Sequence, residues 1–232
     1  NTQDGLLVFI LMLAAWAVLH SVETGKLRYL LFSFTLIGLG FNIKMLQAYM
    51  VLPALFAVYF FCTRHNFWKK VTHLGIAVTL LLFISLSWAI AVDSVSAENR
   101  PFIGSSTDNT VMELIVGHNG VKRILGNADI NQVNTILQAG IGLAGGGRGV
   151  NTQEVGQPGI FRLISLPLAD QAGWLLFPAL SGLVLAVLML GKTSLTGEKQ
   201  TAVILWSGWL LPMLLYFSFT SGLWHTYYLV ML

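Results

Sequence analysis

Residues 29–62 read YLLFSFTLIGLGFNIKMLQAYMVLPALFAVYFFC and decide the fold class of this chain. These 34 residues are apolar except for a short break at Asn42–Lys44, which Gln47 follows. A membrane-spanning helix needs about 20 apolar residues, so this block is too long for one crossing and suits two. We therefore expect a helical hairpin in a membrane, with its tip near residues 42–47.

The composition of the whole chain also indicates a membrane protein. Hydrophobic residues make up 55% and charged residues only 10% of its 232 residues, whereas a soluble domain carries about 25% charged residues. So few polar side chains could not cover a water-soluble globule, which excludes an ordinary cytosolic enzyme and a disordered protein. The formal net charge of +3 is too small to indicate nucleic-acid binding. The single cysteine, Cys62, excludes an intrachain disulfide.

The apolar blocks predict an all-α, polytopic transmembrane bundle of about seven spans, the last of them partial. Besides the two arms of the hairpin, the expected spans are residues 5–22, 73–92, 172–191, 201–219 and a stretch that starts at 227. We divide the chain into membrane segments over 1–92, a long polar loop with short helices over 93–170, and membrane segments over 171–232. Because no Met opens the chain and its last residues lie in an apolar run, we expect an internal piece of a longer protein, truncated at its C-terminus.

Alternation of the spans places the loops 23–28, 63–72 and 192–200 on one side of the membrane. These loops hold seven Lys and Arg residues against two Glu residues, and such an excess in short loops is typical of the cytoplasmic side. The segment 93–170 and the hairpin tip then face the other side. We therefore expect a multi-pass protein of the cell membrane with its active face extracytoplasmic.

Lys44 and Asp4 are the first candidate site residues. Lys44 lies within the 34-residue apolar block, and a charge at such a position is a functional hypothesis by default. The alternative is a lysine that snorkels to the interface from the hairpin tip. Asp4 comes directly before a span on the same side, where it is either a solvated helix cap or a functional carboxylate.

His225 lies beside Tyr227 and Tyr228 at the outer mouth of the last spans. Tyrosines at that depth are typical of the aromatic belt of membrane proteins, which is the preferred interpretation for both. His225 would face the same compartment as Lys44 and Asp4. No spacing of histidines and carboxylates predicts a metal site.

A dense polar cluster lies in the outer loop. Its members are Glu113, His118, Asn119, Lys122 and Arg123. A phosphate or sugar site is one interpretation and a solvated helix face is the other, and the spacing alone does not choose between them.

Local patterns in the loop predict two short amphipathic helices, over 110–125 and 129–138, and an apolar interfacial segment over 161–168. The glycines at 140–149 match a dinucleotide-binding pattern as text, but no strand precedes them. We interpret them as a flexible surface loop.

Four segments together resemble a known family. They are residues 1–4 (NTQD) before a span, 38–47 (GLGFNIKMLQ), 100–120 (RPFIGSSTDNTVMELIVGHNG) followed by Arg123, and 224–228 (WHTYY). In this order they are similar to segments of the membrane glycosyltransferases related to protein O-mannosyltransferases and aminoarabinose transferases, and in particular to the bacterial branch called YkcB-like or mannosyltransferase-like. Ile43 departs from the pattern, because threonine is common there.

The resemblance implies a GT-C fold and transfer of a mannose-like or related sugar from a polyprenyl-phosphate donor to a lipid, protein or cell-wall acceptor. It implies that Asp4 is the second acidic position of the site and that Lys44 lies near the lipid phosphate. The main catalytic base of the family would then precede residue 1, so the chain alone is expected to be inactive. Glu113, Asn119, Arg123 and His225 remain candidate substrate contacts. A divalent metal finds no support in the sequence.

Two other classes of function stay open at this point. One is a transporter or lipid-handling protein in which the outer loop is a gate, and the other is a membrane scaffold with an outer interaction loop. A transporter is expected to carry charges near the membrane midplane. The polar residues of this chain gather at one face, which favours the enzyme.

Overall fold

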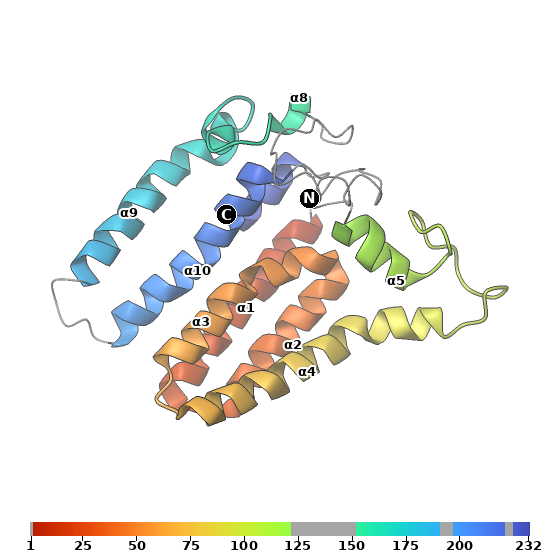
Figure 1. Cartoon of the computed structure of the whole chain (residues 1–232), viewed down its shortest axis with the longest axis horizontal. Coiled ribbons are helices and arrows are strands. Elements are labelled where there is room, and N and C mark those ends of the chain that lie inside the picture. The colour runs from red at the N-terminus through yellow and green to blue at the C-terminus, as the bar shows by residue number, and fades with distance from the viewer. Residues whose placement is uncertain (1, 122–151, 191–196, 221–224) are drawn as a thin grey trace, which may run out of the picture.

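The computed structural model describes residues 2–121, 152–190, 197–220 and 225–232. These residues form helices and no strand, which confirms the predicted all-α class. The longer helices are α1 (Thr2–Thr24), α2 (Leu27–Lys44), α3 (Leu52–Cys62), α4 (Phe67–Asp93), α9 (Trp174–Leu190) and α10 (Gly197–Phe219) (Figure 1). The shorter elements are η1 (Met45–Val51), α5 (Val111–Glu113), η2 (Leu114–Val121), α8 (Thr152–Val155), η3 (Arg162–Ile164), η4 (Ala169–Gly173) and η5 (Thr226–Met231).

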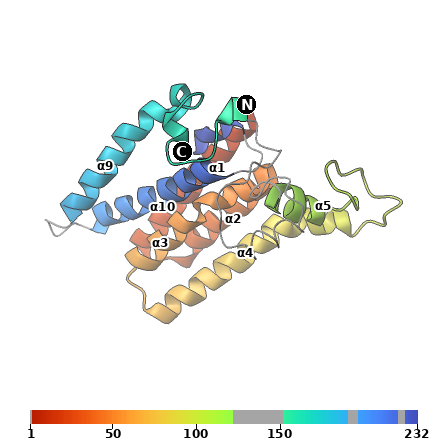
Figure 2. The ribbon, with the colours of Figure 1, turned by 45° about the horizontal axis from the view of Figure 1, so that its top comes forward.

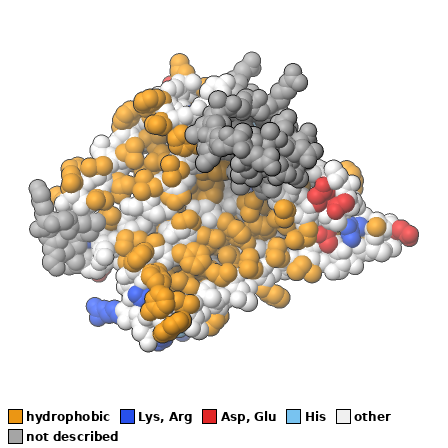
Figure 3. Space-filling model, in the orientation of Figure 1, with side chains coloured by type: hydrophobic (Ala, Val, Ile, Leu, Met, Phe, Trp, Pro, Cys, Tyr) orange, Lys and Arg blue, Asp and Glu red, His pale blue; other side chains and the backbone are white. Residues whose placement is uncertain are grey.

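The long helices have the length and composition of membrane spans. Four candidate spans occur in the described residues, and a shorter apolar helix occupies Trp174–Met189. Large apolar side chains point outward along the bundle, among them Phe83 at 74% and Trp88 at 60% exposure. The space-filling view shows such side chains over most of one face (Figure 3). A surface this apolar requires lipid around it, so the chain is a polytopic membrane protein.

The apolar block at residues 29–62 is folded as two helices, α2 and α3. α2 ends at Lys44, and Met45 has a φ of 38°, in the left-handed region that L-residues seldom adopt. The 3-10 segment η1 then crosses the end of the bundle, and Pro53 lies in the first turn of α3, where its missing N–H costs nothing. Lys44 is therefore the last residue of the first helix of the hairpin.

The connections of the long helices define two ends of the molecule. The His65 end holds the turns at 25–26 and 63–66, which join α1 to α2 and α3 to α4. The Lys44 end holds the start of α1, the tip η1, the short helices α5 and α8, and η5 (Figure 1 and Figure 2). The short elements α5, α8 and η5 therefore lie at the same end as Lys44.

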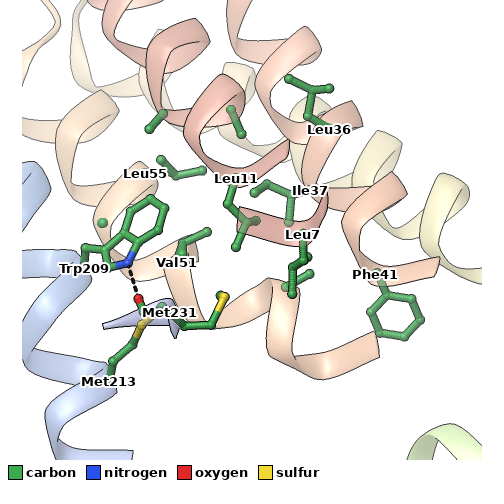
Figure 4. Close-up of a cluster of buried hydrophobic side chains, with 14 of the residues drawn as sticks. Leu7, Leu11, Leu36, Ile37, Phe41, Val51, Leu55, Trp209, Met213 and Met231 are labelled. Atoms are coloured by element: carbon green, nitrogen blue, oxygen red, sulfur yellow. Dashed lines mark hydrogen bonds between the residues drawn. The ribbon is translucent and has the colours of Figure 1, made fainter. Parts of the chain in front are cut away.

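The core lies where α1 packs against α2 and α3, while α10 packs against α3 and α4 against α2. Buried leucines, isoleucines and aromatic side chains from these helices meet there (Figure 4). Gly208 of α10 lies so close to α3 that a Cβ would stand 2.7 Å from the Cα of Ala54. The indole N–H of Trp209 donates to the carbonyl of Met231 over 2.9 Å, which attaches η5 to α10.

The outer segment begins with a capped turn. Asp93 accepts hydrogen bonds from the backbone N–H groups of Val111 and Met112 over 2.8 and 3.0 Å, and the Thr110 hydroxyl accepts from the N–H of Glu113 over 3.1 Å. The helix expected from residue 110 thus starts at Val111 and continues as the π-helical η2 as far as Val121. The helix expected at 129–138 and the glycine-rich loop at 140–149 lie outside the described residues.

Two apolar stretches, one expected as an interfacial segment and one as the start of a span, contain short 3-10 elements. Residues 161–168 contain only the single 3-10 turn η3, because Pro167 cannot donate the backbone hydrogen bond that would continue it. The stretch from Tyr227 is the 3-10 helix η5, in which Tyr228, Leu229 and Met231 are buried. A seventh span starting there stays a prediction, as does the division at residues 92 and 170.

Candidate functional site

A buried ion pair at the Lys44 end joins the two candidate residues that lie in the spans. The Lys44 ammonium donates to Asp4 Oδ1, although the residues are 40 positions apart in the chain. The Lys44 side chain is only 14% exposed and that of Asp4 is 4% exposed. A snorkelling lysine would instead expose its ammonium. Asp4 lies inside the first turn of α1, and its Oδ1 binds a side chain, so the structure does not support the interpretation as a solvated cap.

Two tyrosines of η5 lie against the Lys44 ammonium. The Lys44 Nζ lies 3.8 Å from the ring centroid of Tyr228 and 5.0 Å from that of Tyr227. A cation over an aromatic face is attracted by the ring quadrupole, the more so where water is excluded. The two tyrosines therefore do more than mark the aromatic belt: they form a cage around the cation.

The ion pair leaves hydrogen-bonding capacity unused. Asp4 Oδ2 is buried and has no hydrogen-bond partner among the described residues. The amide of Gln47, on η1, is buried and has none among the described residues either. Unsatisfied buried polar atoms are rare, because each costs about 1–3 kcal/mol. Asp4 Oδ2 and the Gln47 amide are therefore polar groups of this end whose hydrogen-bonding capacity is not used by the described residues.

A second carboxylate lies beside the tyrosine cage. Glu154 of α8 accepts from His225 Nδ1, with distances of 3.1 and 3.3 Å to its two oxygens, and from the backbone N–H of Thr226 over 3.2 Å. The His225 ring stacks on Tyr227 with centroids 5.1 Å apart and planes 10° from parallel. The predicted site residue His225 is thus adjacent to the cage. The sequence analysis missed Glu154, and no local motif marks it.

A cavity of about 590 Å³ opens next to the ion pair. Asp4, Gln171, Thr226 and Tyr227 supply its polar lining, and the remaining walls are the apolar side chains of α9, α10 and η5. An adjoining apolar cavity of about 410 Å³ lies between α9 and α10 and shares Ala179, Leu210 and Leu232 with the first. Asp4 is therefore the charged residue that lines the first cavity, Lys44 is its partner in the ion pair, and the second cavity adds an apolar extension.

The His65 end carries a different set of polar contacts. The Tyr59 hydroxyl lies 2.5 Å from His73 Nδ1, His65 Nε2 lies 3.1 Å from the carbonyl oxygen of Gly25, and the Lys70 ammonium donates to the carbonyl of Phe60 over 2.6 Å. The first and third of these bonds join α4 to α3, and the second joins the turn at 63–66 to the turn at 25–26. They fix the connections between helices.

Comparison with known proteins gives the relatives of the chain. Residues 1–88 match the family model of dolichyl-phosphate-mannose-protein mannosyltransferases. Two proteins of Bacillus subtilis (strain 168), YycA and YkcB, are named as mannosyltransferases and are 34% and 32% identical to this chain over 295 and 304 aligned residues. No solved structure matches the chain significantly.

The chain belongs to this mannosyltransferase family. The resemblance that the four sequence segments indicated is thereby confirmed. Both alignments take in the whole of the chain but only 43% of YycA and 42% of YkcB, so the chain spans less than half of the length of these relatives. The part that matches the family model contains both Asp4 and Lys44.

Glu113, in this mannosyltransferase-family chain, holds a turn together. Its carboxylate accepts from the Ser106 hydroxyl over 2.7 Å, from the Asp108 backbone N–H over 3.0 Å, and from the N–H and hydroxyl of Thr107. These hydrogen bonds hold the pKa of Glu113 well below its usual range, because they stabilise the ionised form. The geometry gives Glu113 a structural task, and its role as a substrate contact stays a prediction.

The remaining candidates lie at or beyond the limit of the described chain. The backbone of Asn119 belongs to η2, but its side chain lies outside the described part, and so does all of Arg123. No group of three or more His, Cys, Asp or Glu side chains among the described residues could hold a metal ion.

Proposed function

We propose that the protein containing this chain transfers a mannose-like sugar from a polyprenyl-phosphate donor to an acceptor at the Lys44 end of the bundle. The observation that carries this proposal is the buried Lys44–Asp4 pair with its unused carboxylate oxygen. Family membership supports a glycosyltransferase rather than another membrane function. The pair lies at one end of the helices, whereas a transporter is expected to carry its charges near the midplane.

The chemistry of the transfer matches the two charges. An acceptor hydroxyl attacks the anomeric carbon of the donor, the bond between that carbon and the phosphate oxygen breaks, and the phosphate leaves with the electron pair. The Lys44 ammonium is placed to stabilise the charge that develops on the phosphate. The acceptor proton passes to a carboxylate, which acts as a general base. In the family pattern the main base is another acidic residue, and Asp4 is the second.

Asp4 has two tasks in this proposal. Its Oδ1 holds Lys44 in place, and its Oδ2 is left to accept a hydrogen bond from a hydroxyl of the sugar or of the acceptor. The anomeric carbon becomes cation-like as the phosphate departs, as it does in glycoside cleavage. A carboxylate nearby stabilises that positive charge. The resemblance implies inversion at the anomeric carbon.

The two cavities support a lipid-linked donor. A polyprenyl phosphate is an anion on a long apolar chain, and it needs a cationic pocket that continues into an apolar groove. The 590 Å³ cavity begins at Asp4, and the 410 Å³ cavity extends it between α9 and α10. We place the phosphate at Lys44 and the first isoprene units along these helices.

The test uses the full-length protein and the variants Lys44→Ala and Asp4→Asn. Each is expected to abolish transfer of radiolabelled sugar from a polyprenyl-phosphate donor while membrane insertion is unchanged. Lys70→Ala is the matched control, because Lys70 also donates a partly buried hydrogen bond but lies at the His65 end. Wild-type transfer by both Lys44→Ala and Asp4→Asn would contradict the site assignment.

The proposal places the Lys44 end outside the cytoplasm, from the excess of basic residues in the loops of the His65 end. Single cysteines at exposed positions test this in the Cys62→Ser background. A membrane-impermeant thiol reagent added to intact cells is expected to label Ala97→Cys and not Glu198→Cys. The opposite pattern would contradict the orientation.

A further inference from the structure

We propose that Glu154 is a positioning residue that holds the Tyr227–Tyr228 cage over the Lys44 ammonium. This inference rests on the proposed function and deepens it, because it assigns a residue of the outer segment to the donor-phosphate site. The contacts form one continuous series. They run from the Glu154 carboxylate through His225 and Thr226 to the tyrosines, and from the tyrosines to Lys44.

The first step is the anchoring of α8, which does not depend on His225. Arg162 is buried, and its Nε donates to the carbonyl of Val155 over 2.8 Å while its Nη1 donates to the carbonyl of Thr220 over 2.8 Å. The backbone N–H of Gly159 also donates to the carbonyl of Ser218 over 2.8 Å. These bonds attach α8 to the end of α10. Glu154 directly precedes Val155 in α8, so these bonds fix the position of its backbone.

The second step is the capping of η5. His225 precedes the first residue of this 3-10 helix, and no side-chain cap from His225 satisfies its first N–H groups. The Glu154 carboxylate takes that place, because it accepts from the Thr226 N–H over 3.2 Å. An anionic group at the N-terminal end of a helical turn is also favoured by the local backbone dipoles. The contact fixes where η5 begins.

The third step is the orientation of the rings. Tyr227 and Tyr228 follow Thr226 directly, so the position of the first turn of η5 sets the position of both rings. The stacking of His225 on Tyr227 and the edge-to-face contact of Tyr227 with Tyr228, with centroids 4.9 Å apart, leave the pair little freedom to rotate. The Tyr228 ring lies 3.8 Å from the Lys44 Nζ as a result.

The functional consequence concerns the anion that Lys44 binds. Asp4 and the two rings together decide the direction in which the ammonium presents its remaining N–H groups. If the two rings were free to move, the Lys44 ammonium would move with them. The donor phosphate would then bind less tightly. Because the series acts on the ammonium that receives the donor phosphate, binding of the acceptor is expected to be unaffected.

The test is a double-mutant cycle on the full-length protein with a radiolabelled polyprenyl monophosphate as the probe. Glu154→Ala removes the cap, and loss of a hydrogen bond to a charged group corresponds to roughly tenfold to hundredfold in an equilibrium constant. We therefore expect Glu154→Ala to raise the Kd of the probe by about tenfold or more. We expect the KM of the acceptor to stay within about twofold. Glu154→Gln keeps an oxygen for the Thr226 N–H and is expected to recover most of the affinity.

The matched control is Glu98→Ala, which removes an exposed carboxylate from the same outer segment and is expected to leave the Kd unchanged. In the Lys44→Ala background, Glu154→Ala is expected to weaken the probe no further, because both changes act on the same ammonium.

Three results would overturn the inference. One is a wild-type Kd for Glu154→Ala. Another is an equal weakening by Glu154→Ala with and without Lys44, which would make the two sites independent. The third is a wild-type Kd for Lys44→Ala, which would overturn the proposed function as well; weakening by Lys44→Ala alone would leave the proposed function standing. Thermal unfolding of each variant separates loss of the fold from loss of the site.

Discussion

The two ends of the helix bundle use polar residues in opposite ways. At the His65 end, the side chains of His65, His73 and Lys70 bond to neighbouring turns and side chains, and they fix the helix connections. At the Lys44 end, a lysine and an aspartate are buried together with an oxygen that no described residue satisfies. Such a buried group costs several kcal/mol in a membrane protein, which is why it motivates a functional hypothesis.

The two ends therefore differ in what their polar contacts border. The contacts at the His65 end join neighbouring helices and turns. Removal of one of them loosens the connection between two helices. The contacts at the Lys44 end join α1, α2 and η5, and beyond these elements a cavity begins. Matched substitutions at the two ends should therefore differ in their effects on the free energy of unfolding and on binding of the donor.

The largest difference is expected from removal of one partner of the ion pair. Asp4→Ala leaves a buried ammonium without its carboxylate, at a cost of about 3–5 kcal/mol in the free energy of unfolding. The double variant Asp4→Leu with Lys44→Met removes both charges and should recover most of that loss. Lys70→Ala at the His65 end should cost about 1 kcal/mol. Unfolding in detergent measures all three, and equal losses for Asp4→Ala and Lys70→Ala would contradict the contrast between the ends.

The next effect concerns the apolar extension of the site. Gly182 of α9 lines the cavity between α9 and α10, and nothing lies within 4 Å of a Cβ built there, so Gly182→Leu fills the groove without a clash. The lost contact with an isoprenoid chain should raise the KM of a long-chain donor by about tenfold. A short-chain donor should be unaffected. Gly75→Leu on α4 is the control, because its Cβ is equally unhindered but lies away from the cavity.

A smaller effect is expected from the aromatic cage. Tyr228→Leu removes a ring from the Lys44 ammonium, and this contact is worth about 1 kcal/mol, or about fivefold in the Kd of a polyprenyl monophosphate. Tyr228→Phe keeps the ring and should keep most of the affinity. At the His65 end, Arg28 lies 4.8 Å from the Tyr29 ring centroid in a comparable pair. A change in Kd for Tyr29→Leu as large as that for Tyr228→Leu would argue against a specific role of the cage.

The smallest effect on transfer is expected at Glu113. Because its pKa is lowered in the fold from an ordinary value of 4.5, its ionised form stabilises the turn at 106–108 above that pH, and the contribution is lost as the pH falls below it. Glu113→Gln should speed hydrogen exchange at the backbone N–H groups of Thr107 and Asp108 at neutral pH. Transfer should stay within about twofold of wild type. A much larger loss of transfer would restore Glu113 as a substrate contact.

Part of this architecture follows directly from the sequence. The break between α2 and α3 was predictable, because a lysine inside an apolar run cannot remain among lipid tails. The common end of Asp4 and Lys44 followed from alternation of the spans. Thr110 and Glu113 match the threonine-x-x-glutamate pattern of a helix start, and this local signal could have identified a structural task for both residues; the structure contains the bond from the Glu113 N–H to the Thr110 hydroxyl, while the Glu113 carboxylate binds the turn at 106–108 instead.

The rest depends on contacts between distant parts of the chain. Glu154 and His225 are 71 residues apart, and their contact depends on how Arg162 attaches α8 to the end of α10. No periodic pattern or motif records such a contact. The tyrosines matched the aromatic belt equally well, since the same residue types serve both purposes. Their contact with the Lys44 ammonium depends on the position of η5 in the fold.

The most direct test of the central claim is a comparison of two lipids, a polyprenyl monophosphate and the corresponding polyprenol, for binding to the full-length protein. The two share the apolar chain and differ in the phosphate alone. The wild type is expected to prefer the phosphate by at least about tenfold, as for a charge-assisted contact. Lys44→Met should lose that preference, and Lys70→Met should retain it. An unchanged preference in Lys44→Met would contradict the claim that this lysine receives the donor phosphate.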